Sequence, residues 1–469
     1  MKIEYLGNTE KKSIENTMRY VASAGLLSRA KGKVFDVIES RNDYEKNVNV
    51  IKNITGYGHN SITEHQYLLF GLEDVTPIVE QTLINHRLTS FTIKSRRNVD
   101  FRNEGFYVPN FKYKDGSIVK DNEYYQNKYK EYMKNLFLKY GNLVDQQLPI
   151  EDCRYILPYC YHSTFFMGCN ANELLKIVTR LKYGEESKIT ELYDLGCKFE
   201  EIMQVITPYF IDKLNREKDN IKYQDNFSFL DNYIDINDKL LDRAHLTSYT
   251  NSPDLNVCIS ILKNRYQLSD TDAIKVLQKL KLEDNDIEKK MVDGLLKNAK
   301  IRELEQVNFS YEMPISLASL THITRHRMHS LMVPSFVPLW NFNNYVIPKS
   351  IQGDSLEEYK EVFNNNSKMM QTFKDVGIRD EDLIYFYLSG HACNISTTMN
   401  ARNLMWISRM RCCNKAQWEI RDRINECVND TIQVAPLIGS LLGPTCKVEG
   451  YCPEGKDSCK NGPVIIKKK

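Results

Sequence analysis

The sequence contains an imperfect internal duplication, and this feature limits the possible folds more than any other. The motif His-Arg-x-x-Ser begins at His86 and again at His326, an offset of 240 residues, and Asn170-Ala171 recurs as Asn400-Ala401 at an offset of 230. One short motif can recur by chance, but several that keep their order and spacing rarely do. The duplication therefore predicts two copies of one folded unit.

The residues around the two motifs follow one local plan. From Glu305, apolar Val307, Phe309 and Tyr311 alternate with polar residues, which predicts a half-buried strand, and a comparable stretch begins at Glu64. Apolar residues at helical spacing predict a long helix in each half. They are Tyr125, Tyr129, Tyr132, Met133 and Leu136 in the first half and Tyr359, Val362, Phe363, Met370 and Phe373 in the second. The predicted fold class is α+β, with a repeat at 1–228 and another at 229–469.

Composition excludes several classes of protein. With 42% hydrophobic and 26% charged residues, the 469-residue chain is globular and long enough for two or three cores. Its formal charge of +2 gives no global positive field, so we expect no nucleic-acid polymer as partner. No run approaches the roughly 18 apolar residues that span a bilayer, and the first residues hold no apolar run. We therefore expect a cytoplasmic protein with no membrane partner and with its twelve cysteines reduced.

A basic segment in the first half is typical of a phosphate site. Arg87, Lys94, Arg96 and Arg97 lie within eleven residues, together with the hydroxyls of Ser90, Thr92 and Ser95. Guanidinium groups and short hydroxyls in a loop suit a phosphate monoester through charge-assisted hydrogen bonds. The alternative from the residues alone is a solvated basic turn.

A second group of polar residues lies near the end of the chain. Asn400, Arg402 and Arg411 fall in one predicted helical stretch, with Leu404 and Ile407 as a buried stripe that Ile420 extends. Taken alone, Arg411 would be a surface ion-pair partner.

Neither histidine nor cysteine spacing predicts a metal. His59 and His65 are six residues apart, which fits neither a helical pair nor a zinc finger. Cys446, Cys452 and Cys459 lack a C-x-x-C pair and an evident fourth ligand. We expect no metal site.

Together the motifs resemble those of the flavin-dependent thymidylate synthases. The matching stretches are GHNSITEH from Gly58, RHRMHS from Arg325, LPYCYHSTFF from Leu157, NAR from Asn400 and AQWEI from Ala416. They cover both halves, so the chain resembles two fused copies of the family domain. The resemblance implies an antiparallel sheet flanked by helices in each copy. It also implies active sites between subunits of a tetramer, with each site drawing a loop from one subunit and a helix from another.

The resemblance assigns roles to residues of this sequence. The implied nucleotide-binding residues are Lys94, Ser95, Arg96, Arg97, Arg154, His322 and Arg325, and the implied pyrimidine-polarising catalytic residue is Arg411. The implied flavin-binding residues are His59, Ser61, Ile93, Arg325, His326, Arg327, Asn400, Ala401, Arg402 and Trp406. Three of these residues depart from the family pattern: Ile93, His322 and Trp406. Asn98, directly after the basic loop, is a further departure.

The two halves have lost complementary parts of the implied site. The first half keeps the phosphate loop but has Asn85, Asn172 and Leu181 where the second half has Arg325, Arg402 and Arg411. The second half has Phe336 to Pro338 in place of the basic loop and Ile384 in place of Arg154. One composite site per chain therefore keeps most of its parts, which indicates that this site stayed in use.

The implied reaction is transfer of a one-carbon unit from methylenetetrahydrofolate to C5 of dUMP, with FAD as cofactor and NADPH as reductant. The substitutions leave two alternatives open: a related flavoenzyme that modifies another pyrimidine nucleotide, for example by hydroxymethylation, or a non-catalytic nucleotide-binding protein. Because each chain supplies two family units, we expect a homodimer that mimics the tetramer.

Overall fold

The chain folds into two compact units. The computed structural model describes residues 1–8, 13–27, 30, 33–219, 227, 229–230, 239–297, 301–337 and 339–459. The first unit consists of residues 1–237 with 336–339 and 348–389, and the second of 238–335 with 340–347 and 390–469. The predicted repeat boundary at residue 228 lies outside the described residues. The units differ from the two sequence repeats because 348–389 belong to the first unit, so the boundary stays a prediction.

The first unit contains a four-stranded antiparallel sheet with the strand order β1-β2-β4-β3. Its strands are β1 (Lys2–Asn8), β2 (Tyr67–Val75), β3 (Thr89–Ile93) and β4 (Ser163–Asn170). Alternate side chains of β2, at Leu68, Phe70 and Leu72, are fully buried, because successive residues of a strand point to opposite faces. The helices of this unit are α1 (Ile14–Leu27), α2 (Val34–Glu39), α3 (Tyr44–Gly56), α4 (Pro77–Ile84), α5 (Asn122–Asp145), α6 (Ile150–Cys153), α7 (Ala171–Tyr183), α8 (Thr190–Ile206), α9 (Ile211–Arg216), α14 (Asp354–Asp375) and α15 (Asp380–Leu383).

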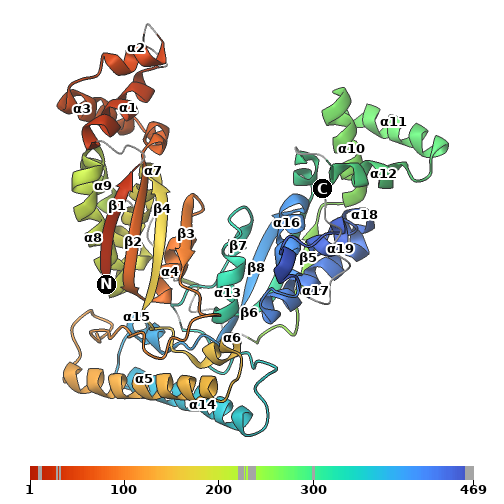
Figure 1. Cartoon of the computed structure of the whole chain (residues 1–469). Coiled ribbons are helices and arrows are strands. Elements are labelled where there is room, and N and C mark those ends of the chain that lie inside the picture. The colour runs from red at the N-terminus through yellow and green to blue at the C-terminus, as the bar shows by residue number, and fades with distance from the viewer. Residues whose placement is uncertain are drawn as a thin grey trace. The chain divides into compact units, whose positions relative to one another are not determined.

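The second unit repeats this sheet, with the strand order β5-β6-β8-β7. Its strands are β5 (His245–Tyr249), β6 (Asn308–Ser316), β7 (Ser330–Met332) and β8 (Ala392–Asn400). Its helices are α10 (Pro253–Tyr266), α11 (Asp270–Glu283), α12 (Ile287–Leu295), α13 (Leu317–Ile323), α16 (Ala401–Arg411), α17 (Trp418–Val434), α18 (Pro436–Gly439) and α19 (Thr445–Glu449). Figure 1 shows both sheets with their helices. The predicted α+β fold in two antiparallel copies is confirmed.

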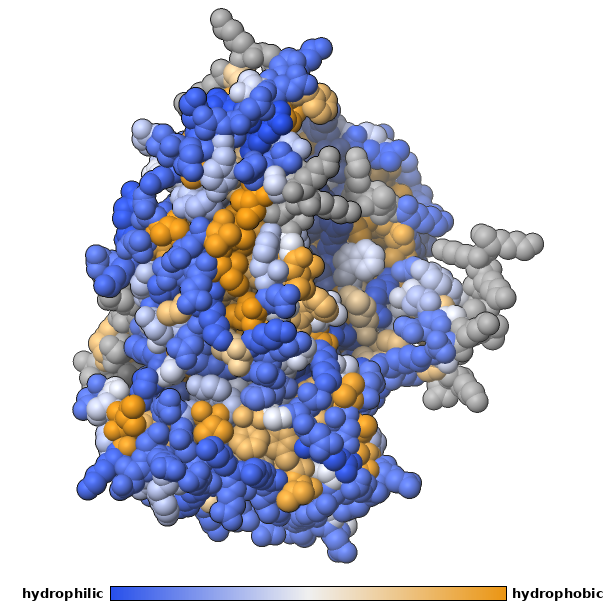
Figure 2. Space-filling view, turned by 60° about the vertical axis from the view of Figure 1, so that its left-hand side comes forward, coloured by the Kyte–Doolittle hydropathy of each residue, from blue (hydrophilic) through white to orange (hydrophobic). Residues whose placement is uncertain are grey.

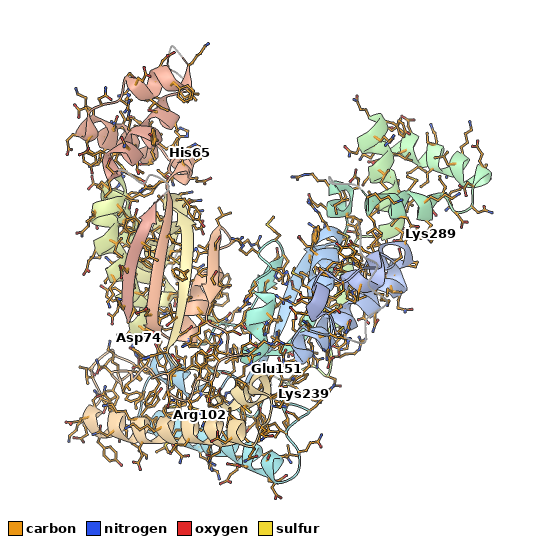
Figure 3. The ribbon with its side chains drawn as sticks, in the orientation of Figure 1. His65, Asp74, Arg102, Glu151, Lys239 and Lys289 are labelled. Atoms are coloured by element: carbon orange, nitrogen blue, oxygen red, sulfur yellow. The ribbon has the colours of Figure 1, made fainter. Side chains whose placement is uncertain are left out.

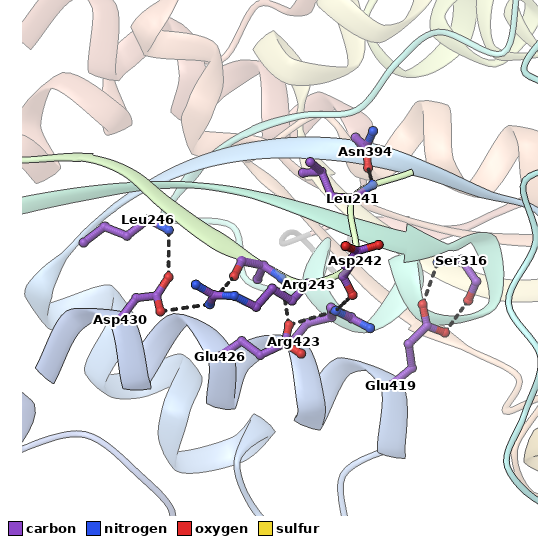
Figure 4. Close-up of polar contacts among 11 residues, drawn as sticks. Leu241, Asp242, Arg243, Leu246, Ser316, Asn394, Glu419, Arg423, Glu426 and Asp430 are labelled. Atoms are coloured by element: carbon purple, nitrogen blue, oxygen red, sulfur yellow. Dashed lines mark hydrogen bonds and ion pairs between the residues drawn. The ribbon is translucent and has the colours of Figure 1, made fainter. Parts of the chain in front are cut away.

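A buried carboxylate holds the helix that follows the central strand in each unit. In the first unit Glu191 accepts hydrogen bonds from the backbone N and the Oγ1 of Thr76, at 2.9 and 2.7 Å. In the second unit Glu419 accepts from the backbone N and Oγ of Ser316 at 2.7 and 2.6 Å (Figure 4). Burial raises the pKa of Glu191 to about 7. Because Thr76 and Ser316 are the N-caps of α4 and α13, the duplication extends to individual polar contacts.

In the second unit, further carboxylates attach the segment before β5 to α17. Asp430 accepts from Nη1 of Arg243 at 2.9 Å and from the backbone N of Leu246 at 3.1 Å. Glu426 accepts from the backbone N of Ala244 at 2.7 Å (Figure 4). These contacts fix the edge strand β5 on the helix that carries Glu419.

The two long helices predicted from spacing, α5 and α14, both lie in the first unit, and both predictions are confirmed. Equivalent residues of the two repeats also pair with one another in the first unit. Pro158 of the first repeat forms an antiparallel bridge with Leu388 of the second. The backbone N of Tyr159 donates to the carbonyl of Tyr387 at 2.6 Å. A segment of the second repeat therefore completes the first unit. It pairs with the equivalent segment of the first repeat, so a local two-fold axis relates the two segments.

The outer faces of the two sheets differ in polarity. In the first unit Leu6, Leu69 and Phe166 are 40–54% exposed. In the second unit the outward positions of β6 and β8 include Ser310 and Thr398, whose hydroxyls are 2.8 Å apart. Figure 2 shows apolar side chains gathered within a largely hydrophilic surface. Among the described residues, no helix has the length and apolar character needed to cross a membrane.

Candidate functional site

The basic loop of the first unit is held at the end of β3. The backbone N of Lys94 donates to the carbonyl of Thr164 at 3.1 Å, which continues the pairing of β3 with β4 past Ile93. The ammonium of Lys94 lies 2.5 Å from Glu104, and both side chains are about one-third exposed. Lys94 is therefore oriented by a carboxylate and remains accessible to solvent.

Arg96 is buried in the same loop. Its Nη1 lies 2.6 and 2.8 Å from the two carboxylate oxygens of Glu80 on α4, and the two side chains are 6% and 0% exposed. Ser163 also donates to Glu80. Burial alone would lower the pKa of Arg96, but Glu80 more than offsets this effect and the net shift is upward. Arg96 is therefore a permanently charged part of the interior that shapes the loop.

Arg97 and Arg154 converge on a single acidic residue. The Nε of Arg97 lies 2.7 Å from a carboxylate oxygen of Glu151, and the Nε of Arg154 donates to the backbone carbonyl of Glu151 at 3.1 Å. Arg97 is 31% exposed, whereas Arg154 is 4% exposed. Burial, followed by the charge of Arg96, lowers the pKa of Arg154. The structure thus brings Arg97 and Arg154 together, with Arg97 the more accessible cation.

Ser95 stabilises the turn between these cations. Its Oγ accepts from the side-chain amide of Asn98 at 3.2 Å and from the backbone N of Arg97 at 3.4 Å. Asn98, which departs from the family pattern, therefore has a structural role in the loop.

In the second unit, α16 begins at a side-chain cap. Oδ1 of Asn400 accepts from the backbone N of Asn403 at 2.9 Å, as expected for an N-cap residue. In the first turn of the helix, Nη1 of Arg402 lies 2.5 Å from Glu305. Leu404 and Ile407 are buried, so the predicted apolar stripe is confirmed.

His326 and Arg411 meet at the other end of α16. The Nε of Arg411 donates to Nε2 of His326 at 3.0 Å. Burial and the charge of Arg411 lower the pKa of His326 to about 3, so the imidazole is neutral and carries its proton on Nδ1. The guanidinium of Arg411 is thereby oriented by a neutral acceptor that does not reduce its charge.

Other predicted residues are placed around this pair. Arg325 and Arg327 are exposed on either side of His326. Trp406 is 51% exposed on α16, and Ala401 is buried at its first turn. His322 is only 6% exposed within α13, and its predicted contact with a nucleotide stays a prediction.

The two groups of motifs lie at opposite ends of the first sheet. Ile93 pairs with Phe165 at the level of Leu72, whereas Thr89 pairs with Cys169 at the level of Leu68. The five residues of β3 span roughly 13 Å at about 3.3 Å per residue, so Lys94 and the His86 motif lie at different ends. Figure 3 shows the two ends of β2, marked by His65 and Asp74.

His59 and Ser61 lie with the His86 end. Both are exposed, at the start of the 3-10 helix η1 (Asn60–His65), which leads into β2. The first unit therefore does not bring them to the basic loop, and their predicted contact with a flavin stays a prediction.

The lost positions of each repeat are filled by structural residues. Leu181, which matches Arg411, is 1% exposed, and Asn172, which matches Arg402, donates to Glu64 at 3.1 Å. Ile384, which matches Arg154, is fully buried, and the ring of Phe336, which matches Arg96, lies 6.1 Å from that of Tyr159. None of these four positions keeps the cation that its counterpart carries.

Sequence reasoning did not assign the carboxylates that hold these cations. They are Glu80, Glu104, Glu151 and Glu305. One signal was present in the duplication: at an offset of 240, Glu80 is matched by Leu320, so the acid was lost together with its arginine.

These features define a family of enzymes. The family model described as thymidylate synthase complementing protein matches residues 4–208 and 245–437, which is most of the chain and includes both repeats. The chain therefore belongs to this family. The expected family and enzyme class, a methyltransferase, are confirmed.

Relatives of this chain are named flavin-dependent thymidylate synthases. The protein of Clostridium tetani is 34% identical over 191 residues, covering 36% of this chain and 76% of the relative. The protein of Pyrococcus furiosus is 32% identical over 224 residues, covering 45% and 89%. That of Thermococcus onnurineus is 31% identical over 226 residues, covering 46% and 90%. Each match covers most of the relative but less than half of this chain, as expected of a duplicated domain.

A solved structure shares a low overall similarity with the chain. The UMP/dUMP methylase PolB from Streptomyces cacaoi, bound with 5-Br dUMP, is 19% identical and covers 45% of this chain and 94% of its own, with a TM-score of 0.38. At that score, nothing about function follows.

Proposed function

We propose that the protein transfers a one-carbon unit from methylenetetrahydrofolate to C5 of dUMP and forms dTMP, using FAD and NADPH. The reaction takes place at composite sites that combine the basic loop of the first repeat with α16 and the His326 segment of the second. One observation supports the composite site: the basic loop and the His-Arg motif occupy opposite ends of the first sheet, and the cations of the basic loop are kept only in the first repeat, whereas Arg325, Arg402 and Arg411 are kept only in the second.

The accessible cations of the first unit bind the nucleotide phosphate. Lys94 and Arg97 are each about one-third exposed and each oriented by a carboxylate. A phosphate monoester competes with Glu104 and Glu151 for these cations, which bind it through charge-assisted hydrogen bonds. Arg96 and Arg154 contribute positive charge from the interior.

Arg411 acts on the pyrimidine. The guanidinium of Arg411 is always charged, so it stabilises negative charge that develops near N3 and O4 of the pyrimidine ring. This stabilisation is effective because the guanidinium is already oriented before the reaction begins. His326 holds the Nε–H of Arg411, so the remaining N–H groups can be directed at the base. Neutral His326 keeps the full positive charge available.

The donors of the second unit suit an anionic dinucleotide such as FAD. Arg325 and Arg327 are exposed, and Arg402 lies in the first turn of α16, where it contacts Glu305. These guanidinium groups would hold the pyrophosphate, and the exposed face of Trp406 would offer a stacking surface worth about 0.5–1.5 kcal/mol. When bound, FAD supplies the reducing equivalents of the reaction.

Mass spectrometry of the nucleotide product tests the proposal. The protein is incubated with dUMP, FAD, NADPH and methylenetetrahydrofolate at low oxygen. A product in which a methyl group has replaced one hydrogen of dUMP supports thymidylate formation. A hydroxymethylated product supports the alternative of a flavoenzyme that makes another modified pyrimidine nucleotide. Unchanged dUMP with retained FAD indicates another acceptor, whereas a colourless inactive protein indicates a non-catalytic nucleotide-binding protein.

Matched variants test the composite site. Lys94→Ala and Arg411→Ala should reduce turnover by at least about 100-fold, because each removes a retained group that holds or polarises dUMP. Ser335→Ala, at the position equivalent to Ser95 in the lost loop, should leave turnover within about two-fold. Equal losses from all three variants would refute one composite site per chain.

We further propose that the chain assembles as a homodimer. The family unit occurs twice per chain, and the apolar outer face of the first sheet is of the kind that protein contacts use. Size-exclusion chromatography with light scattering should give the mass of two chains, and a mass of four would contradict it.

A further inference from the structure

A groove lies between the end of α3 and α9 in the first unit. Its volume is about 580 Å³, which is within the range of small-molecule sites. All of its lining residues are exposed, so the groove is open to solvent. A ligand bound there must therefore remain partly hydrated.

Polar contacts hold the two walls of this groove together. On α9, Nζ of Lys213 donates to Oδ1 of Asn60 at 2.8 Å and to the carbonyl of Thr55 at 3.4 Å. Just before α9, the buried hydroxyl of Tyr209 donates to the side chain of Gln66 at 2.6 Å. The groove is therefore a preformed feature of the first unit.

Gly56 keeps the floor of the groove open. It is the last residue of α3, its φ lies outside the left-handed region, and a Cβ at this position would meet no atom within 4 Å. Neither backbone conformation nor packing therefore requires glycine, which lowers helix stability relative to alanine. The open space beside Gly56 is available to a ligand.

The lining combines two cations with an aromatic ring. The side chain of Tyr57 is 84% exposed. Lys52 forms an exposed ion pair with Asp212 across the groove, and such a pair is displaced at small cost. The Nε of Arg216 donates to the backbone carbonyl of Asp212 at 3.3 Å, and its other N–H groups make no hydrogen bond with a described residue. Both cations are therefore accessible to an anion.

Two amides complete the lining. Asn53 lies on α3 and Asn215 on α9, and neither side chain forms a hydrogen bond with a described residue. Each amide offers two N–H donors and one carbonyl acceptor, and the carboxylate of Asp212 is a further acceptor. Together with the cations and the ring, these groups match a chain of carboxylates and amides attached to an aromatic ring.

We propose that this groove binds the glutamyl tail of the folate co-substrate, an inference that rests on the proposed function. Lys52 and Arg216 bind the carboxylates of the tail through charge-assisted hydrogen bonds. Asn53 and Asn215 bind its amide groups, and Tyr57 packs against the aminobenzoyl ring.

The character of the groove favours such a chain over a nucleobase. Pockets that enclose a ring system are mostly apolar and bury most of the ligand, whereas a glutamyl chain keeps its charges and part of its hydration. Tyr57 also lies two residues before His59, a predicted flavin contact. The proposed reaction brings folate and flavin together, so a folate tail close to His59 agrees with it.

Calorimetric titration of the full chain with γ-linked p-aminobenzoyl-pentaglutamate tests the proposal. The probe carries no one-carbon unit, so its binding does not depend on turnover. Lys52→Ala and Arg216→Ala should each raise its Kd at least about 5-fold, and Gly56→Leu, which fills the groove, at least about 10-fold. Gly294→Leu is the matched control, because Gly294 lies near the end of α12 with the same open space at its Cβ position. This control should keep the wild-type Kd.

Thermal unfolding shows whether the variants fold. Gly56→Leu and Gly294→Leu should both keep or exceed the wild-type midpoint, because leucine favours a helix more than glycine does. A wild-type Kd in Gly56→Leu would overturn the proposal. So would equal affinity for α-linked pentaglutamate without the aminobenzoyl group, which would show unspecific attraction between charges.

The same titration separates this inference from the proposed function. A chain that forms dTMP but does not bind the probe would overturn the inference alone. A chain that binds the probe with these variant effects but forms no dTMP would overturn the proposed reaction and support the groove as a glutamyl site.

Discussion

At the scale of single residues, the arginines of the basic loop divide into buried and accessible groups. Arg96 is 6% exposed and rests on the fully buried Glu80, whereas Arg97 is 31% exposed and rests on Glu151. The two arginines are equivalent in the sequence motif, but only Arg97 is accessible to a ligand. We therefore propose that Arg96 serves stability and that Arg97 serves nucleotide binding.

We expect Arg96→Ala to lower the free energy of unfolding by about 3–5 kcal/mol, because it leaves the buried Glu80 carboxylate without its cation. Arg97→Ala should change stability by less than about 1 kcal/mol and raise the Kd for dUMP at least about 10-fold. Urea unfolding and calorimetric titration measure the two effects. Similar stability losses from both variants would contradict the division.

His326 should make stability depend on pH. Its pKa is about 3 in the folded chain against an ordinary value of 6.5, so the unfolded chain binds more protons between these values. Its contribution to the free energy of unfolding is therefore complete above pH 6.5 and is lost as pH falls towards 3.

Urea midpoints at pH 7.5 and 5.0 measure this dependence. The drop between these values should be smaller in His326→Gln than in the wild type, because glutamine cannot take up the proton. His59→Gln, at an exposed histidine, is the control and should retain the wild-type drop. An unchanged drop in His326→Gln would show that His326 is not the source.

At the scale of elements, the same helix start serves two purposes in the two repeats. Asn170 caps α7 and Asn400 caps α16, each by accepting from a backbone N three residues on, at 2.8 and 2.9 Å. Only α16 carries the retained arginines. The cap is structural in both repeats, and we propose that in the second repeat it also supports flavin binding.

The caps provide a matched pair of variants. Asn170→Ala and Asn400→Ala should each cost about 1 kcal/mol of stability, since each leaves a helix N–H without its side-chain acceptor. Only Asn400→Ala should also weaken FAD binding, followed by flavin fluorescence. Weaker FAD binding in both variants would place the flavin at both repeats.

At the scale of the whole molecule, the repeats are not independent folding units. The first unit includes residues 348–389 of the second repeat. Phe373 of α14 lies 5.2 Å from Phe111, and Phe386 lies 5.2 Å from Tyr129, as measured between ring centroids. The apolar side of α5 therefore depends on a segment that follows it by more than two hundred residues.

We expect the fragment 1–237 to lack a cooperative unfolding transition, because the apolar surface of α5 loses its partners. Co-expression with the fragment 238–469 should restore the transition and co-purify the two pieces. Circular dichroism during thermal unfolding measures this result. A cooperative transition in 1–237 alone would show that the exchanged segment is dispensable.

The sequence by itself determined the duplication, the family, the fold class and the long helices, because motif order and apolar periodicity are local properties of a chain. It also identified which cations each repeat has kept. The tertiary structure decided which of those cations are buried, because burial depends on acids such as Glu80 that lie on other elements. Only folding showed that 348–389 complete the first unit, since this depends on contacts between residues distant in sequence.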